Sequence, residues 1–210
     1  MLVLMHGYGA PGNDLVPLAR QLEVERSVRF AFPAAPLSLD QMPGARAWWH
    51  IDMAELQRAV MLHDYETLTT RVPAGLLEAR ATVSALLDAL ETDHGAARDQ
   101  LVLGGFSQGA MLATDVTLHL ERPPAALVIL SGSLICKNEW LPRMKARAGL
   151  PVVQSHGRAD PVLGYDLAEK LRDELSAAGL KVEFHPFNGG HGIPNGVISA
   201  LGQLVKRVTA

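Results

Sequence analysis

The sequence is poor in cysteine, in aromatic residues and in excess charge of either sign. Cys136 is the single cysteine of 210 residues, so no disulfide can form within the chain, which suits a reducing compartment. The formal net charge is −3 and no basic stretch recurs, so the charge pattern does not indicate nucleic-acid binding or attraction to an anionic membrane surface. No apolar run approaches the roughly 20 residues that a membrane-spanning helix needs. We therefore expect neither a nucleic-acid partner nor stable membrane insertion.

The N-terminus also lacks the features of a secretory signal. Met1 leads directly into the apolar run Leu2–Met5, with no basic residues before it and no cleavage site behind it. We therefore expect a cytoplasmic protein. Because the strand-like run starts at residue 2, the question of a segment preceding it in the native chain stays open.

What the chain does contain is the composition of a globular domain with a sizeable core. Hydrophobic residues make up 48% and charged residues 20%, and 210 residues fit one α/β domain, so we predict a single domain over residues 1–210. Several short runs are apolar almost throughout, as parallel strands covered on both faces are. The predicted strands are Leu2–Met5, Val28–Phe32, Gln100–Gly104, Ala126–Leu130, Val152–Ser155 and Val182–His185.

Amphipathic stretches alternate with these runs. Pro73–Leu90, Asp166–Ala178 and Gly196–Val208 each carry apolar residues at helical spacing, and Gly179 follows the second of them as a stop signal. Alternation of strands with helices is typical of an α/β fold with a doubly wound, mostly parallel sheet.

Residues 33–72 interrupt the alternation. This stretch is long, contains three prolines and holds Trp48 and Trp49, two of the chain's three tryptophans. Long connections in compact domains are usually functional or disordered, and this one is too apolar for disorder. We interpret it as a folded cap lying over a pocket; the alternative is a surface loop that packs on the core for stability.

Residues 105–109, Gly-Phe-Ser-Gln-Gly, match the pattern G-x-S-x-G. An apolar strand precedes the pattern and a helix-like run follows it, so Ser107 falls on a strand-to-helix turn that projects its hydroxyl beyond the sheet. Small residues on both sides relieve the crowding of such a turn. The N-terminus of the following helix directs free N–H groups at the site, and Gln108 N–H is a candidate donor to an oxyanion. The alternative is a Gly-Ser turn without catalytic meaning.

A serine hydroxyl needs an adjacent base to become a good nucleophile. His191 lies in a glycine-rich loop after the last predicted strand, and Asp160 follows the strand before it, at the sheet edge where α/β folds assemble sites. The order Ser107, Asp160, His191 is that of α/β-hydrolase triads, in which the carboxylate orients the imidazole. Two competing carboxylates are less suited: we expect Asp166 inside the next helix facing solvent, and Asp115 as a surface charge.

The first predicted strand ends in His6-Gly7-Tyr8-Gly9-Ala10, a glycine-rich turn that can supply a second oxyanion donor, which we assign to Tyr8 N–H. Phosphate-binding loops share such glycines, but neither G-x-G-x-x-G nor a Walker lysine is present. No histidine pairs with cysteine or carboxylates at metal-ligand spacing, so we expect no metal and no cofactor.

Taken together, these motifs resemble the phospholipase/carboxylesterase family of α/β-hydrolases, which includes bacterial carboxylesterases and acyl-protein thioesterases. The resemblance runs nearly end to end and is carried by His6-Gly7 with Gly9-Ala10, residues 105–109, His156-Gly157 with Asp160-Pro161, and Gly190-His191. It implies Ser107, Asp160 and His191 as the triad and Tyr8 and Gln108 as oxyanion donors. His50 departs from the aspartate that commonly follows the family's aromatic pair, here Trp48-Trp49. Ala110 replaces a second glycine after the strand-to-helix turn that carries Ser107, the nucleophile elbow.

The resemblance implies hydrolysis of carboxylic esters through an acyl-enzyme, with activity rising through about pH 6–8 as the base loses its proton. We expect a small-molecule ester of short to medium acyl chain as substrate, and a homodimer is left open. An apolar acyl or alcohol site is predicted from Trp48, Trp49, Met53, Leu163 and Ile193. Two alternatives remain: a thioesterase with the same triad, and an inactive hydrolase-like binding module.

Overall fold

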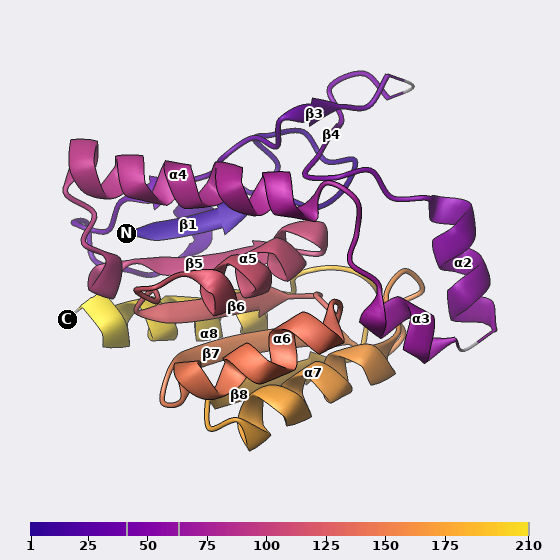
Figure 1. Ribbon diagram of the computed structural model, residues 1–210. Coiled ribbons are helices and arrows are strands. Elements are labelled where there is room, and N and C mark those ends of the chain that lie inside the picture. Colours follow the sequence, from indigo (N-terminus) through magenta and orange to yellow (C-terminus); the bar gives the residue numbers. More distant parts are fainter. Residues whose placement is uncertain (41, 63, 210) are drawn as a thin grey trace.

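A parallel six-stranded sheet forms the centre of the molecule (Figure 1). The computed structural model describes residues 1–40, 42–62 and 64–209. The strand order is β2-β1-β5-β6-β7-β8, and every neighbouring pair is parallel. In chain order the strands are β1 (Leu2–Met5), β2 (Phe30–Ala31), β5 (Val102–Phe106), β6 (Ala126–Leu130), β7 (Pro151–Gly157) and β8 (Lys181–Phe187).

The strands are apolar on both faces because helices cover both. Along β1, Leu2 and Leu4 belong to one buried cluster while Val3 and Met5 belong to the other, as the two-residue period of a strand requires. Helices α1 (Leu18–Gln21) and α8 (Asn195–Thr209) pack against the first cluster.

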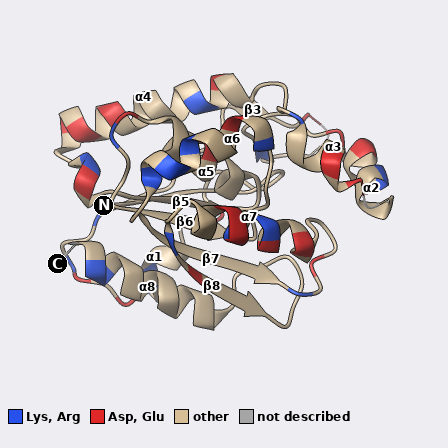
Figure 2. Ribbon diagram, turned by 60° about the horizontal axis from the view of Figure 1, so that its bottom comes forward, with Lys and Arg blue, Asp and Glu red and all other residues tan. Residues whose placement is uncertain are grey.

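The opposite face of the sheet is covered by four further helices (Figure 2). These are α4 (Leu76–His94), α5 (Gln108–His119), α6 (Lys137–Met144) and α7 (Tyr165–Ala177). Short 3-10 turns lie at Arg98–Gln100 and Lys145–Arg147. The predicted doubly wound α/β sheet is therefore confirmed.

The predicted cap is also confirmed. Residues 33–72 contain a two-stranded antiparallel hairpin, β3 (Leu37–Ser38) with β4 (Arg46–Ala47), and two helices, α2 (Met53–Met61) and α3 (Tyr65–Thr70). Both helices begin at an aspartate whose carboxylate accepts a backbone N–H three residues on, a typical N-cap. Figure 1 shows α2 and α3 standing beyond the carboxyl ends of the strands, where the sheet would otherwise be open.

Two elements differ from the sequence prediction for local reasons. Strand β2 has two residues instead of the predicted five, since it pairs with β1 alone at the sheet edge. Helix α6 was not predicted, because Pro142 lies inside it and its amphipathic pattern is short; Trp140 and Met144 are its buried residues.

The prediction that Asp115 is a surface charge was wrong, because this residue is fully buried on α5. Its Oδ2 accepts from Arg80 Nε at 2.6 Å and its Oδ1 accepts from Arg80 Nη2 at 3.0 Å. The indole Nε1 of Trp140 donates to the same Oδ1 at 2.9 Å. This carboxylate thus joins α4, α5 and α6, and the charge is tolerated because it is paired and hydrogen-bonded. Asp166, by contrast, is exposed in the first turn of α7, as expected.

Asp115→Asn should destabilise the fold, because it leaves the partly buried Arg80 guanidinium beside a neutral, fully buried group. Breaking a buried pair by changing one partner costs about 3 kcal/mol or more in the free energy of unfolding. Urea denaturation measures this loss, and Asp173→Asn, at an exposed ion pair with Arg172, serves as the matched control. Equal midpoints for the two variants would contradict the structural role of Asp115.

Candidate active site

Ser107 occupies a strained turn between β5 and α5. Its backbone angles are φ 54° and ψ −117°, a region that residues with a side chain rarely adopt. The turn is possible because the backbone passes very close to its neighbours at two glycines. A Cβ on Gly105 would lie 2.4 Å from the carbonyl carbon of Gly109, and one on Gly109 would lie 2.1 Å from the carbonyl oxygen of Met5. Both positions of G-x-S-x-G therefore require glycine for steric reasons.

His191 reaches the same edge of the sheet from the loop after β8. Its Nδ1 lies 2.6 Å from Oδ2 of Asp160, and its ring centroid lies 4.7 Å from that of Phe106. Because the carboxylate accepts, Nδ1 carries the hydrogen, and Nε2 is left as the basic nitrogen. The loop is held by the Ser131 hydroxyl, which donates to the Gly192 carbonyl at 3.2 Å.

The side chain of Asp160 is completely buried, and both carboxylate oxygens accept hydrogen bonds. Oδ1 accepts the backbone N–H groups of Val162 at 2.8 Å and Leu163 at 3.0 Å. Burial alone would raise the pKa of Asp160, but hydrogen bonds from His156, His191 and these two N–H groups outweigh it and hold the pKa well below its ordinary value. The group is therefore ionised at neutral pH, and it orients His191 as a carboxylate.

Ser107 and His191 line one cavity. The described atoms form no direct hydrogen bond between them in this structure, in which His191 bonds to Asp160. Bonds between nucleophile and base are often long before substrate binds, and tighten in the complex. The structure thus brings together the three residues that the sequence singled out.

Two backbone N–H groups in the turns around the cavity make no hydrogen bond to another described residue. Gln108 N–H is the first of α5, and Tyr8 N–H lies in the turn after β1; neither donates to another described residue. The turn is fixed by His6, whose Nδ1 donates to Gly7 O at 2.8 Å and whose Nε2 accepts from Ala35 N–H at 3.0 Å. Burial lowers the pKa of His6, which favours the neutral imidazole that this pairing needs.

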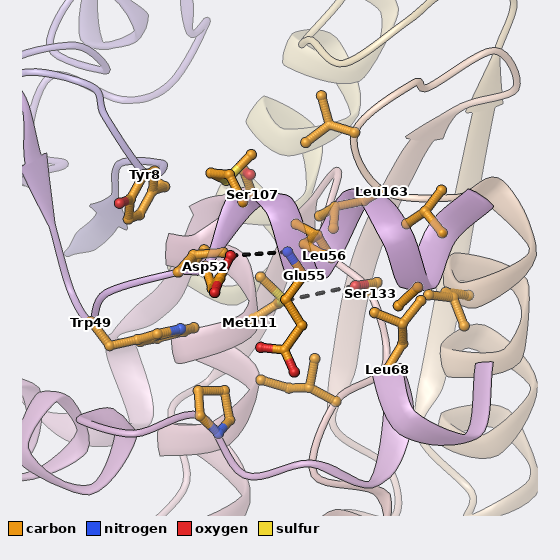
Figure 3. A pocket seen from close by; sticks show the side chains of 18 of the residues that line it. Tyr8, Trp49, Asp52, Glu55, Leu56, Leu68, Ser107, Met111, Ser133 and Leu163 are labelled. Carbon is orange, nitrogen blue, oxygen red and sulfur yellow. Dashed lines mark hydrogen bonds between the residues drawn. The ribbon is translucent and has the colours of Figure 1, made fainter. Parts of the chain in front are cut away.

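The cavity has a volume of about 560 Å³ and lies between the cap helices and the body of the fold. Figure 3 shows Ser107 among apolar side chains that include Trp49, Leu56 and Met111. Of the residues predicted to bind substrate, Trp49, Met53 and Leu163 line it, and so does His50. Sequence reasoning did not single out the following lining residues: Leu56, Ala59, Leu68, Met111, Ile135 and Leu167.

Trp48 and Ile193 were predicted to bind substrate, but neither lines this cavity. Trp48 is buried on the other side of the chain, where its indole Nε1 donates to His6 O at 3.0 Å. Trp48 and Trp49 lie in a bend directly after β4, and only Trp49 lines the cavity. Ile193 packs against the core beside α8 and borders a second hollow, which shares His191 with the cavity.

The side chain of Gln108 has a role that the sequence did not indicate. Its Oε1 accepts from Trp48 N–H at 2.9 Å and its Nε2 donates to Trp49 O at 2.8 Å. The amide thereby fixes the segment of the cap between β4 and α2 directly to the turn that carries Ser107. Both of its hydrogen-bonding groups are satisfied within the buried interior.

Neither metal nor thiol chemistry has a basis among the described residues. They contain no group of three or more histidine, cysteine or carboxylate side chains that could hold a metal ion. Burial raises the pKa of the Cys136 thiol to about 12, with Asp115 and Glu139 adding to the effect, so the thiol stays protonated and is a poor nucleophile. In the same described part, no helix has the length and apolar character required to span a membrane.

Comparison with solved structures identifies the fold. Esterase PE8 superposes with a TM-score of 0.79 at 26% sequence identity, over 99% of this chain and 91% of its own. A carboxylesterase from Bacillus cereus superposes with a TM-score of 0.74 at 19% identity, over 99% and 88%. The fold is therefore that of the α/β-hydrolases, as predicted.

A family model described as Phospholipase/Carboxylesterase matches residues 1–208, and the chain belongs to this family. Acyl-protein thioesterase 1 of Debaryomyces hansenii is 28% identical over 203 residues, which span 90% of this chain and 82% of that protein. The resemblance drawn from the motifs is confirmed, and membership makes the chain a hydrolase of the esterase and thioesterase kind.

Gly109→Ala should destabilise the protein, since the added methyl would overlap the Met5 carbonyl oxygen and force α5 away from β1. Such overpacking costs about 3 kcal/mol in the free energy of unfolding. Gly196→Ala is the matched control, as its methyl would meet no atom within 4 Å. Thermal unfolding of both variants checks the expectation, and an unchanged midpoint for Gly109→Ala would show that the elbow is not as tight as described.

Proposed function

We propose that this chain hydrolyses carboxylic esters with Ser107 as nucleophile, His191 as general base and Asp160 as the residue that orients the histidine. The observation that carries the proposal is the 2.6 Å contact between His191 and Asp160 in a cavity whose wall includes Ser107 on its strained turn. The low pKa of Asp160 supports it, because an ionised carboxylate stabilises the imidazolium that forms during attack.

The reaction consists of two acyl transfers. His191 Nε2 takes the Ser107 proton while Oγ bonds to the ester carbonyl carbon, and the carbonyl electrons move to the oxygen, which Tyr8 and Gln108 N–H groups bind. The tetrahedral species expels the alcohol, which receives the proton from His191. Water then attacks the acyl-enzyme by the same route and releases the acid. Because His191 must be neutral to take this proton, protonation of its imidazole at low pH is expected to stop the reaction.

The cavity favours an apolar acyl group. Most of its walls are aliphatic, and burial of each methylene contributes about 0.8 kcal/mol to binding. We propose small-molecule esters of short to medium acyl chain as substrates. A thioesterase reaction is the second candidate, favoured by the similarity to proteins named acyl-protein thioesterase 1. The same triad serves both, since the leaving group differs only in sulfur or oxygen.

A fluorophosphonate probe should label the wild-type protein on Ser107 and leave Ser107→Ala unlabelled, because the probe needs an activated serine. Ser199→Ala, which removes a hydroxyl on the exposed side of α8, is the matched control and should label fully. Mass spectrometry of the intact protein gives the readout. A wild-type protein that is never labelled would instead favour the inactive binding module.

Esters and thioesters of one acyl series separate the two candidate activities. With p-nitrophenyl esters of two to sixteen carbons we expect kcat/KM to be highest at about eight carbons or fewer, and to exceed that for the matching acyl thioesters. Steady-state kinetics on the purified protein measures both series. A preference for thioesters, or for the longest chains, would replace the small-ester proposal with the thioesterase one.

A further inference from the structure

The carboxylate of Asp160 has a fourth hydrogen-bond partner that the proposed reaction does not use. Its Oδ1 accepts two backbone N–H groups, and its Oδ2 faces two imidazoles, those of His191 and His156. His156 lies near the end of β7, at the start of the turn that leads to Asp160, and is completely buried.

The ring of His156 is oriented by two acceptors. Its Nε2 lies 2.8 Å from Leu163 O and 3.2 Å from Asp160 Oδ2. Both oxygens can only accept, so Nε2 must carry a hydrogen and donate to them. The other ring nitrogen, Nδ1, has no partner among the described residues although it is buried. A buried imidazole with one unsatisfied nitrogen lowers the stability of the fold. The presence of His156 at this position therefore suggests a function for the hydrogen bonds that its Nε2 makes.

Residues 157–163 form a closed arrangement around this ring. Leu163 N–H donates to Asp160 Oδ1 while Leu163 O accepts from His156, so the imidazole joins both ends of the turn to the carboxylate. Leu163 also lines the cavity. A shift of His156 would therefore move the carboxylate and one wall of the cavity together.

We propose that His156 is a positioning residue, which acts through Asp160 to hold Oδ2 in place for His191. This inference rests on the proposed triad. By donating to Oδ2, His156 shares the charge of that oxygen with His191 and fixes the direction of its lone pairs. A misplacement of about 1 Å at a catalytic group can cost a factor of about 100 in rate, so a residue that fixes Asp160 matters without touching substrate.

Removal of His156 has a predictable electrostatic sign. Oδ2 then interacts with His191 alone, which stabilises the imidazolium, so the rise of rate with pH moves to higher pH. The pH profile moves in the same direction whether His156 is neutral or protonated in the wild-type protein, because either form donates a hydrogen bond to Oδ2 and withdraws charge from it. The other charged or titratable groups on the His156 side are Tyr165 and, at its ring, Arg158 with Glu169. Those that line the cavity together with His191 are Tyr8, His50, Asp52, Glu55 and Arg71.

The experiment compares three variants at β7. His156→Leu removes the donor at similar volume, His156→Gln keeps an N–H that can reach Asp160, and Ser155→Ala, whose buried hydroxyl has no partner among the described residues, is the control. For His156→Leu we expect kcat to fall about tenfold or more, with KM within about threefold, and the pH profile to move to higher pH. His156→Gln should restore most of kcat and return the profile toward wild type.

A second readout does not depend on turnover. The proton between His191 Nδ1 and Asp160 gives a downfield ¹H NMR resonance in the free protein, and it should shift or broaden in His156→Leu and not in Ser155→Ala. If His156→Leu fails to fold, His156→Asn, whose amide is too short to reach Asp160, takes its place. Kinetics and a resonance equal to those of Ser155→Ala would overturn the inference. Failure of the triad itself would appear separately, as phosphonate labelling that survives in Ser107→Ala.

Discussion

The hydrogen bond between Asp160 and His191 is the interaction on which the site depends, because it joins two loops that belong to different strands. Asp160 follows β7 and His191 follows β8, and these strands are paired along seven residues, so their ends leave the sheet side by side. Gly157 permits the approach: a Cβ there would lie 2.2 Å from Gly190 O. The register of two parallel strands thus determines the distance between a carboxylate and an imidazole.

The second constraint is the contact of the cap with the elbow. Gln108 lies directly after Ser107, and its side-chain amide bonds to the backbone of Trp48 and Trp49, so the cap segment that leads into α2 is held next to the nucleophile. Helices α2 and α3 then close an apolar cavity beyond the strand ends. The backbone N–H of Gln108 faces the oxyanion position in the proposed reaction. Gln108 is therefore part of the elbow, an oxyanion donor in the proposed reaction and the anchor of the cap segment, and its contacts help to determine the shape of the cavity.

Much of this arrangement could be predicted from the sequence, since it depends on local patterns. The strands Leu2–Met5 and Ala126–Leu130 were predicted with their observed bounds, because buried parallel strands are uninterrupted apolar runs. Residues 105–109 indicated the elbow, because the glycines are required by sterics. What could not be predicted depends on tertiary contacts: Asp115 looked like a surface charge because its partner Arg80 is 35 residues away. Trp48 and Trp49 are neighbours in the sequence and differ only in what they contact in the fold: Trp48 donates to His6 O, and Trp49 lines the cavity.

The most direct test of the whole account is to trap the acyl-enzyme and find its position. Rapid mixing of the protein with a p-nitrophenyl ester, followed by acid quenching and peptide mass spectrometry, locates the covalent acyl group. The account predicts a burst of p-nitrophenol equal to the enzyme concentration, with the acyl group on Ser107 and none formed in His191→Ala. Turnover without a burst, and with no acyl adduct on Ser107 under any quenching condition, would contradict it.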